Sequence, residues 1–135
     1  MLGGGNPVAG SNPTGIGQTL NYIGDFAYAY SGKIAVDNNE TTLLKFTTQN
    51  TMVRCRVQFN INDSSGGERF EHNVKIDNQI VQGYQSPGGT DTTGRPDIPL
   101  YIIIPPFTKF EAVAKNVQDT ASRNVMVAIT GRVYT

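Results

Sequence analysis

The feature that most constrains this chain is a ten-residue stretch, residues 52–61, in which apolar and polar side chains alternate. Its apolar members are Val53, Cys55, Val57, Phe59 and Ile61, and the residues between them are Arg54, Arg56, Gln58 and Asn60. Successive side chains of a β-strand point to opposite sides, so a period of two predicts a strand with one buried and one solvent-facing side. The chain is therefore expected to bury this stretch against a second layer.

Seven further stretches have the same character, and residues that favour turns separate them. The predicted strands cover residues 26–36, 42–47, 52–61, 70–76, 79–84, 99–104, 108–116 and 124–134. Eight short strands in about 110 residues favour a β-sandwich, and the jelly roll fits best because it uses eight strands in two sheets. An immunoglobulin domain fits less well, because this chain has one Cys and no Trp. The predicted fold is an all-β, eight-stranded jelly-roll β-sandwich with an extended N-terminal arm.

The N-terminal residues differ in composition from the rest of the chain. Residues 1–24 hold seven of the 15 glycines together with two prolines, and apolar side chains are scattered. Such a segment cannot bury enough apolar surface to fold on itself. A frayed terminus is one interpretation, and an arm that lies across a neighbouring subunit is the other. We favour an arm over residues 1–24, followed by a single domain over residues 25–135.

Charge and hydropathy exclude several classes of partner. Lys plus Arg and Asp plus Glu each number 11, so no overall field attracts nucleic acid or anionic lipid. No stretch approaches the roughly 20 apolar residues that a membrane helix needs, and the N-terminus lacks a signal-peptide pattern. We expect no nucleic-acid partner, no membrane association and assembly in the host cytoplasm.

Residues that could carry metal or nucleophilic chemistry are few. His72 alternates with Phe70 and Val74, and Cys55 alternates with Val53 and Val57, so both are predicted on the apolar side of their strands. A metal site needs several converging ligands, and a reactive thiol needs a lowered pKa. The sequence therefore predicts that Cys55 belongs to the core, that His72 lies in the core or at its rim, and that the protein uses no cofactor or metal.

The acidic residues also lack the spacing of an active site. A glycosidase needs two carboxylates across one cleft, and Glu68, Glu71 and Glu111 show no such clustering. The Asp37-Asn38-Asn39-Glu40 segment concentrates oxygen atoms that could hold calcium, but Asp and Asn are also typical turn residues. We interpret the glutamates as solvated surface and the 37–40 segment as a turn.

Eight residues are candidates for a subunit interface. Tyr22, Phe26, Tyr28 and Tyr30 lie close together, and the last three share one side of a strand; core packing is one interpretation and an interface is the other. Arg54 and Arg56 lie on a polar side, where they are either solvated or bind partner carboxylates. Asp91 and Arg95 lie in the loop over residues 85–97 and supply hydrogen-bonding groups.

Two C-terminal segments carry a resemblance to a known group of proteins. They are Ile102-Ile103-Ile104-Pro105-Pro106-Phe107-Thr108-Lys109-Phe110-Glu111-Ala112 and Val125-Met126-Val127-Ala128-Ile129-Thr130-Gly131-Arg132-Val133-Tyr134. They resemble the closing strands of small jelly-roll proteins of tailed-phage virions, of the head cement or decoration type. The resemblance covers about the last 35 residues and implies a non-enzymatic virion protein with the major capsid protein or other virion proteins as partners. Such proteins lie on or between capsomers at the capsid surface, often as homotrimers, or serve at the tail.

Three other functions compete with this prediction. A glycan- or receptor-binding jelly roll would use the loop over residues 85–97, although the absence of Trp counts against it. A cupin-type isomerase or a small glycosidase would need the ligand or acid clusters that the sequence lacks. The major capsid protein of a small icosahedral virus would need a basic arm, and residues 1–24 contain no Lys or Arg.

Overall fold

The computed structural model describes residues 20–61, 69–85, 99–118 and 120–134. The elements within them are all β-strands. They are β1 (Asn21–Ile23), β2 (Phe26–Tyr30), β3 (Ile34–Val36), β4 (Thr41–Thr47), β5 (Met52–Ile61), β6 (Phe70–Ile76), β7 (Gln79–Gln85), β8 (Leu100–Ile104), β9 (Lys109–Asn116) and β10 (Arg123–Tyr134). In these four ranges no helix has the length and apolar character needed to cross a membrane.

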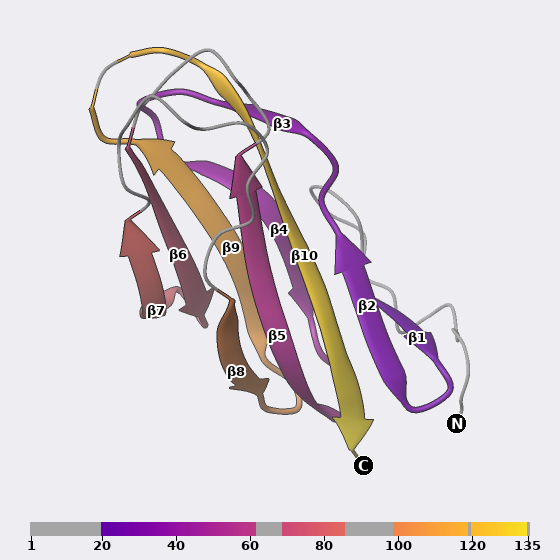
Figure 1. Ribbon diagram of the computed structural model, residues 1–135. Helices are drawn as coiled ribbons and strands as arrows, with labels where there is room; N and C mark the ends of the chain where they lie inside the picture. The colour runs from indigo at the N-terminus through magenta and orange to yellow at the C-terminus, as the bar shows by residue number, and fades with distance from the viewer. Residues whose placement is uncertain (1–19, 62–68, 86–98, 119, 135) are drawn as a thin grey trace.

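The strands form two antiparallel sheets that pack face to face (Figure 1). Sheet A has the order β1-β2-β10-β5-β8, and β3 pairs with β10 beyond the end of β2. Sheet B has the order β4-β9-β6-β7. Each sheet turns one face to the other sheet and one face outward, so the molecule has an interior and two outer faces.

The pairing of the strands defines the topology. β3 pairs with β10, β4 with β9, β5 with β8 and β6 with β7, so the chain from β3 to β10 is one long antiparallel hairpin. Rolling up that hairpin places β10 beside β5 and β9 beside β6. The result is a jelly roll with two four-stranded layers, β3-β10-β5-β8 and β4-β9-β6-β7. The predicted fold class is confirmed for the described residues.

The first predicted strand, residues 26–36, is wrong in one respect, because it is two strands that share β10 as partner. The break lies at Ser31 and Gly32, where the glycine φ of 76° leaves the extended region. Ser31 maintains the ladder across the break, since its backbone N–H donates to the Val127 carbonyl at 3.0 Å and its side-chain oxygen accepts from the Val127 N–H at 2.9 Å. A side chain thus replaces one backbone acceptor of the sheet.

The boundary between arm and domain also differs from the prediction. β1 lies within the predicted arm, residues 1–24, yet it pairs with β2, and Leu20 before it is buried. The two strands join through a turn in which Gly24 has a φ of 61°. The domain therefore includes residues 20–24. The rest of the predicted arm lies outside the described residues.

The core lies between the two sheets and follows the alternation in the sequence. Val53, Val57 and Phe59 of β5 are fully buried, while the arginines between them point outward. From sheet B, Phe46 and Phe110 stack with ring centroids 4.9 Å apart. Complete burial of aromatic rings from one sheet against β-branched residues from the other is the main stabilising term of such a sandwich.

Candidate interaction surface

His72 belongs to the core, as predicted. It is fully buried between Phe59 and Tyr84, with ring centroids 4.8 and 4.9 Å away. Burial disfavours the charged imidazolium and lowers the pKa of His72 to about 4. An imidazole in this position is neutral near pH 7 and is enclosed by aromatic rings, so it packs as a core residue.

Cys55 is likewise a core residue, in agreement with the prediction. Its side chain is buried on the inner face of β5, and this burial raises the pKa of the thiol to about 12. The thiolate is the nucleophilic form of cysteine, so a raised pKa makes the group unreactive at neutral pH. Within the described ranges, no three His, Cys, Asp or Glu side chains are grouped so that they could hold a metal ion.

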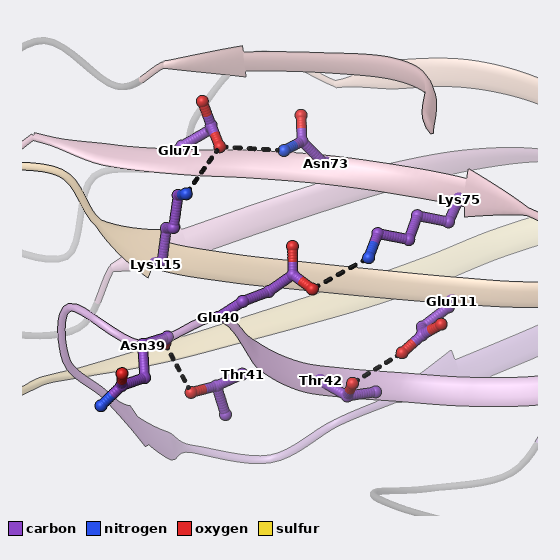
Figure 2. A network of polar contacts seen from close by, with 9 residues as sticks. All are labelled: Asn39, Glu40, Thr41, Thr42, Glu71, Asn73, Lys75, Glu111 and Lys115. Atoms are coloured by element: carbon purple, nitrogen blue, oxygen red, sulfur yellow. Dashed lines mark hydrogen bonds and ion pairs between the residues drawn. The ribbon is translucent and has the colours of Figure 1, made fainter. Parts of the chain in front are cut away.

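The outer face of sheet B carries a network of paired polar groups (Figure 2). The Lys75 ammonium lies 2.9 Å from a Glu40 carboxylate oxygen, and this hydrogen bond raises the pKa of Lys75. Thr42 donates to Glu111 at 2.7 Å. Glu71 accepts a hydrogen bond from Asn73 at 3.2 Å and lies 3.9 Å from Lys115. The glutamates of this face are partners of neighbouring side chains.

The 37–40 segment is a turn, as its composition indicates. The Asn39 N–H donates to the Asp37 side chain at 2.8 Å, which is the local hydrogen bond of an Asx turn. The Glu40 carboxylate points to Lys75 and forms an ion pair with it (Figure 2). The oxygen atoms of this segment are therefore explained by turn geometry and by one ion pair.

The outer face of sheet A has a different composition, which the strand registers define. Two rows of outward-facing residues cross β2, β10, β5 and β8. The first row is Phe26, Arg132, Arg54 and Ile103, and the second is Tyr28, Thr130, Arg56 and Tyr101. In each row an arginine of β5 lies in the centre, and aromatic or aliphatic side chains lie at both ends.

The arginines of these rows have no carboxylate partner in the described part of the chain. Arg54 and Arg132 lie directly opposite each other on β5 and β10, a cross-strand arrangement of like charges that costs stability. The ion pairs between described residues join Lys75 to Glu40 and Lys115 to Glu71, on the other sheet. The Arg132 guanidinium lies 5.6 Å from the centre of the Phe26 ring, a cation–π contact.

A shallow groove with a volume of about 860 Å³ follows these rows, and we call it the arginine–aromatic groove. Its lining includes Phe26, Tyr28, Arg54, Arg56, Val81, Tyr101, Ile103, Thr130, Arg132 and Tyr134. At the base of the groove, Gly131 lets β10 approach β5 closely. A Cβ atom at this position would collide with the Arg54 backbone oxygen and with Cys55. The groove combines exposed rings with three guanidinium groups, a composition typical of protein interfaces.

The predicted interface residues fall into four groups: those that line the groove, an exposed ring beyond it, a core residue, and two residues outside the described ranges. Phe26, Tyr28 and Tyr30 are 47%, 42% and 46% exposed, so the interpretation that they pack in the core is wrong. Ala27 and Ala29 fill the inner positions of β2 instead. Arg54 and Arg56 are exposed, and together with Phe26 and Tyr28 they line the groove, whereas Tyr30 lies beyond it and donates to the Met126 sulfur at 3.1 Å.

The other predicted interface residues are not part of the groove. Tyr22 is 8% exposed, and its hydroxyl is hydrogen-bonded to Thr51 at 2.9 Å, so it belongs to the core. Burial removes it from the set of candidate contact residues. Asp91 and Arg95 lie outside the described residues, as do Glu68 and most of the loop over residues 85–97.

Sequence reasoning missed the contributions of β8 and β10 to the groove. Arg132 and Tyr134 alternate with the inward Val133, so the period of two could have revealed them. Tyr101 and Ile103 gave no such signal, because they stand in the continuous apolar run Leu100–Ile104. Only the pairing of β8 with β5 identifies which members of that run point outward.

No protein-family model matches this chain, and no curated protein is similar to it in sequence. Among solved structures, that of the Gx strain of infectious bursal disease virus aligns over 88% of this chain and 38% of its own, with 15% identity and a TM-score of 0.47. The VP2 subviral particle of the same virus aligns over 90% and 38%, with 14% identity and a TM-score of 0.44. The chain spans less than half the length of either, and a likeness at this level carries no functional assignment.

Proposed function

We propose that this chain is a non-enzymatic structural protein of a virion, of the cement or decoration type, which stabilises the junctions between capsomers. The arginine–aromatic groove carries this proposal. It gathers three arginines without carboxylate partners in the described chain and several exposed rings on one sheet of a rigid jelly roll. Such a surface is costly to leave in water and becomes favourable when a partner covers it.

The partners proposed are the major capsid protein or other virion proteins, including further copies of this chain. A partner that brings carboxylates would complete charge-assisted hydrogen bonds with Arg54, Arg56 and Arg132, and its apolar groups would cover the flanking rings. The resemblance of segments 102–112 and 125–134 to closing strands of phage virion proteins supports the same role. The place of action would be the capsid surface, after assembly in the host cytoplasm.

The mechanism proposed is mechanical. Every copy buries interface area where capsomers meet, and separating the capsomers then requires breaking that interface. The glycine-rich segment at the N-terminus would add contacts at high effective concentration if it crosses to a neighbouring subunit. Glycan or receptor binding through the loop over residues 85–97 stays the alternative prediction.

The proposal is tested on particles purified by density gradient from the source that encodes the chain. A structural protein is expected in intact particles at a fixed ratio to the major capsid protein, and its absence would contradict the virion role. Purified chain added to particles depleted of it should sediment with them. Arg54→Glu should weaken this binding, whereas Lys33→Glu, an equal change of charge at an exposed site outside the groove, should leave it intact.

A further inference from the structure

The turn between β8 and β9 displays an aromatic side chain to solvent. Phe107 is 75% exposed, the highest exposed fraction of any large hydrophobic residue in the described chain. It follows Pro105 and Pro106 and does not line the arginine–aromatic groove. A ring held so far out of the fold contributes little to the core and places apolar surface in water.

The backbone of Phe107 is also strained. Its φ of 54° lies in the left-handed region, which a residue with a bulky side chain rarely occupies. The turn has Pro106 at its second position and Phe107 at its third, where a positive φ favours glycine or asparagine. The sequence therefore places an aromatic residue where local geometry favours glycine, and such departures are concentrated at functional positions.

A buried network holds the strained turn in place. Thr48, which is 2% exposed, donates its hydroxyl to the Pro105 carbonyl at 2.7 Å and accepts from the Thr108 N–H at 2.9 Å. The Thr48 N–H in turn donates to the Thr108 carbonyl at 2.9 Å, and the Phe107 N–H donates to the Gln49 carbonyl at 2.7 Å. These bonds fix the backbone on both sides of Phe107, so its ring can enter a partner at a small entropic cost.

We propose that Phe107 of one copy inserts into the arginine–aromatic groove of a second copy. The inference rests on the proposed function, in that it assigns the assembly surface to a contact between copies. Aromatic rings favour edge-to-face and offset contacts, and guanidinium groups favour ring faces. The groove supplies both kinds of group, and within one molecule Arg132 already lies over the ring of Phe26.

Charge disfavours the simplest alternative, a two-fold pairing of groove against groove. Such a pairing would bring Arg54, Arg56 and Arg132 of both copies together without a described carboxylate between them. Insertion of Phe107 avoids this repulsion, since the contact joins two different surfaces. A head-to-tail contact of this kind closes into a ring or continues as a filament, and the predicted trimer would be a closed ring.

The experiment is sedimentation velocity over a concentration series of the full chain, with two variants. Phe107→Gly removes the ring and relieves the positive φ, so its melting temperature should equal or exceed that of the wild type. Tyr101→Ser/Ile103→Ser removes two exposed side chains of the groove, which are 70% and 53% exposed, and should also fold normally. Each variant should weaken self-association by about 30-fold or more, the typical effect of losing an aromatic anchor.

Mixing the two variants is the decisive experiment. Phe107→Gly retains an intact groove and Tyr101→Ser/Ile103→Ser retains an intact Phe107, so an equimolar mixture should form heterodimers that neither variant forms alone. A wild type that stays monomeric, a Phe107→Gly chain that associates normally, or a mixture that stays monomeric would each overturn the proposal.

Failure of the contact between copies can be distinguished from failure of the virion role. Wild-type chain that binds particles but is monomeric alone would overturn the contact between copies and leave the virion role standing. If the chain self-associates through Phe107 but is absent from purified particles, the contact between copies stands and the virion role is overturned.

Discussion

The two outer faces of this sandwich use their polar residues in opposite ways. On sheet B, Glu111 lies in register between Lys45 and Lys75. The Thr42–Glu111 hydrogen bond and the Lys115–Glu71 ion pair each join neighbouring strands. On sheet A, Arg54 lies opposite Arg132, and no described carboxylate pairs with either. One face satisfies its charges internally, and the other presents them together with exposed rings.

The comparison indicates which face is complete in the single chain. Val113 points to the outer face of sheet B, between Thr42 of β4 and Asn73 of β6, yet it is only 1% exposed. Polar side chains therefore cover an apolar residue on the solvent side of that sheet. No corresponding cover lies over Tyr101 or Ile103 on sheet A, which remain 70% and 53% exposed among the described residues. Under the proposed function, sheet A is the face that a partner covers.

The largest expected effect comes from placing the same charge at the centre of each face. Val113→Asp should lower the free energy of unfolding by about 3 kcal/mol or more, because it places a charge at a position that is 1% exposed and occupied by an apolar side chain. Thr130→Asp is the matched change on sheet A, where the site is exposed and Arg56 lies opposite, so stability should be unchanged or slightly higher. Urea unfolding of both variants measures the contrast, and similar losses in the two would contradict it.

Acid should destabilise the protein through a buried histidine of its interior. Burial lowers the pKa of His72 from 6.5 to about 4, so the unfolded chain binds this proton more tightly than the folded chain. The stabilisation from neutral His72 is complete above pH 6.5 and is lost as the pH falls through about 4. The loss amounts to about 3 kcal/mol, since one pKa unit corresponds to about 1.4 kcal/mol.

The measurement is urea unfolding of wild type and His72→Phe between pH 7 and pH 4. The phenyl ring retains the packing among Phe59 and Tyr84 but cannot bind a proton, so the variant should show a flatter dependence of stability on pH. Equal slopes in the two proteins would show that His72 does not cause the acid sensitivity.

Charge reversal on the two faces should give small effects of opposite sign. Glu111→Lys removes the acceptor of Thr42 and places three lysines in one row, so it should cost about 1 kcal/mol. Arg54→Glu replaces a like-charge pair with a Glu–Arg132 pair and should stabilise the isolated chain by a few tenths of a kcal/mol. Both differences should shrink at high salt, because screening weakens exposed pairs. A loss of stability in Arg54→Glu would show that the arginine already has a stabilising partner.

Much of the fold could be predicted because alternation is a local property. The stretch 52–61 coincides with β5, the inward positions of β6 include His72, and the jelly roll followed from the number and spacing of strands. The interruption at Ser31 and Gly32 was missed, since the hydrogen bonds that hold it come from Val127, far along the chain.

The sequence by itself determined the positions of most strands and placed His72 and Cys55 on the apolar sides of theirs, because periodicity and neighbouring apolar side chains are encoded locally. Only the tertiary structure decided which side of β2 is buried. The side carrying Ala27 and Ala29 faces inward and is buried against the core, so Phe26, Tyr28 and Tyr30 face out. The groove likewise exists only after long-range pairing sets Arg54 between Arg132 and Ile103. Alternation divides a strand into two sides without specifying what lies beside or above each side.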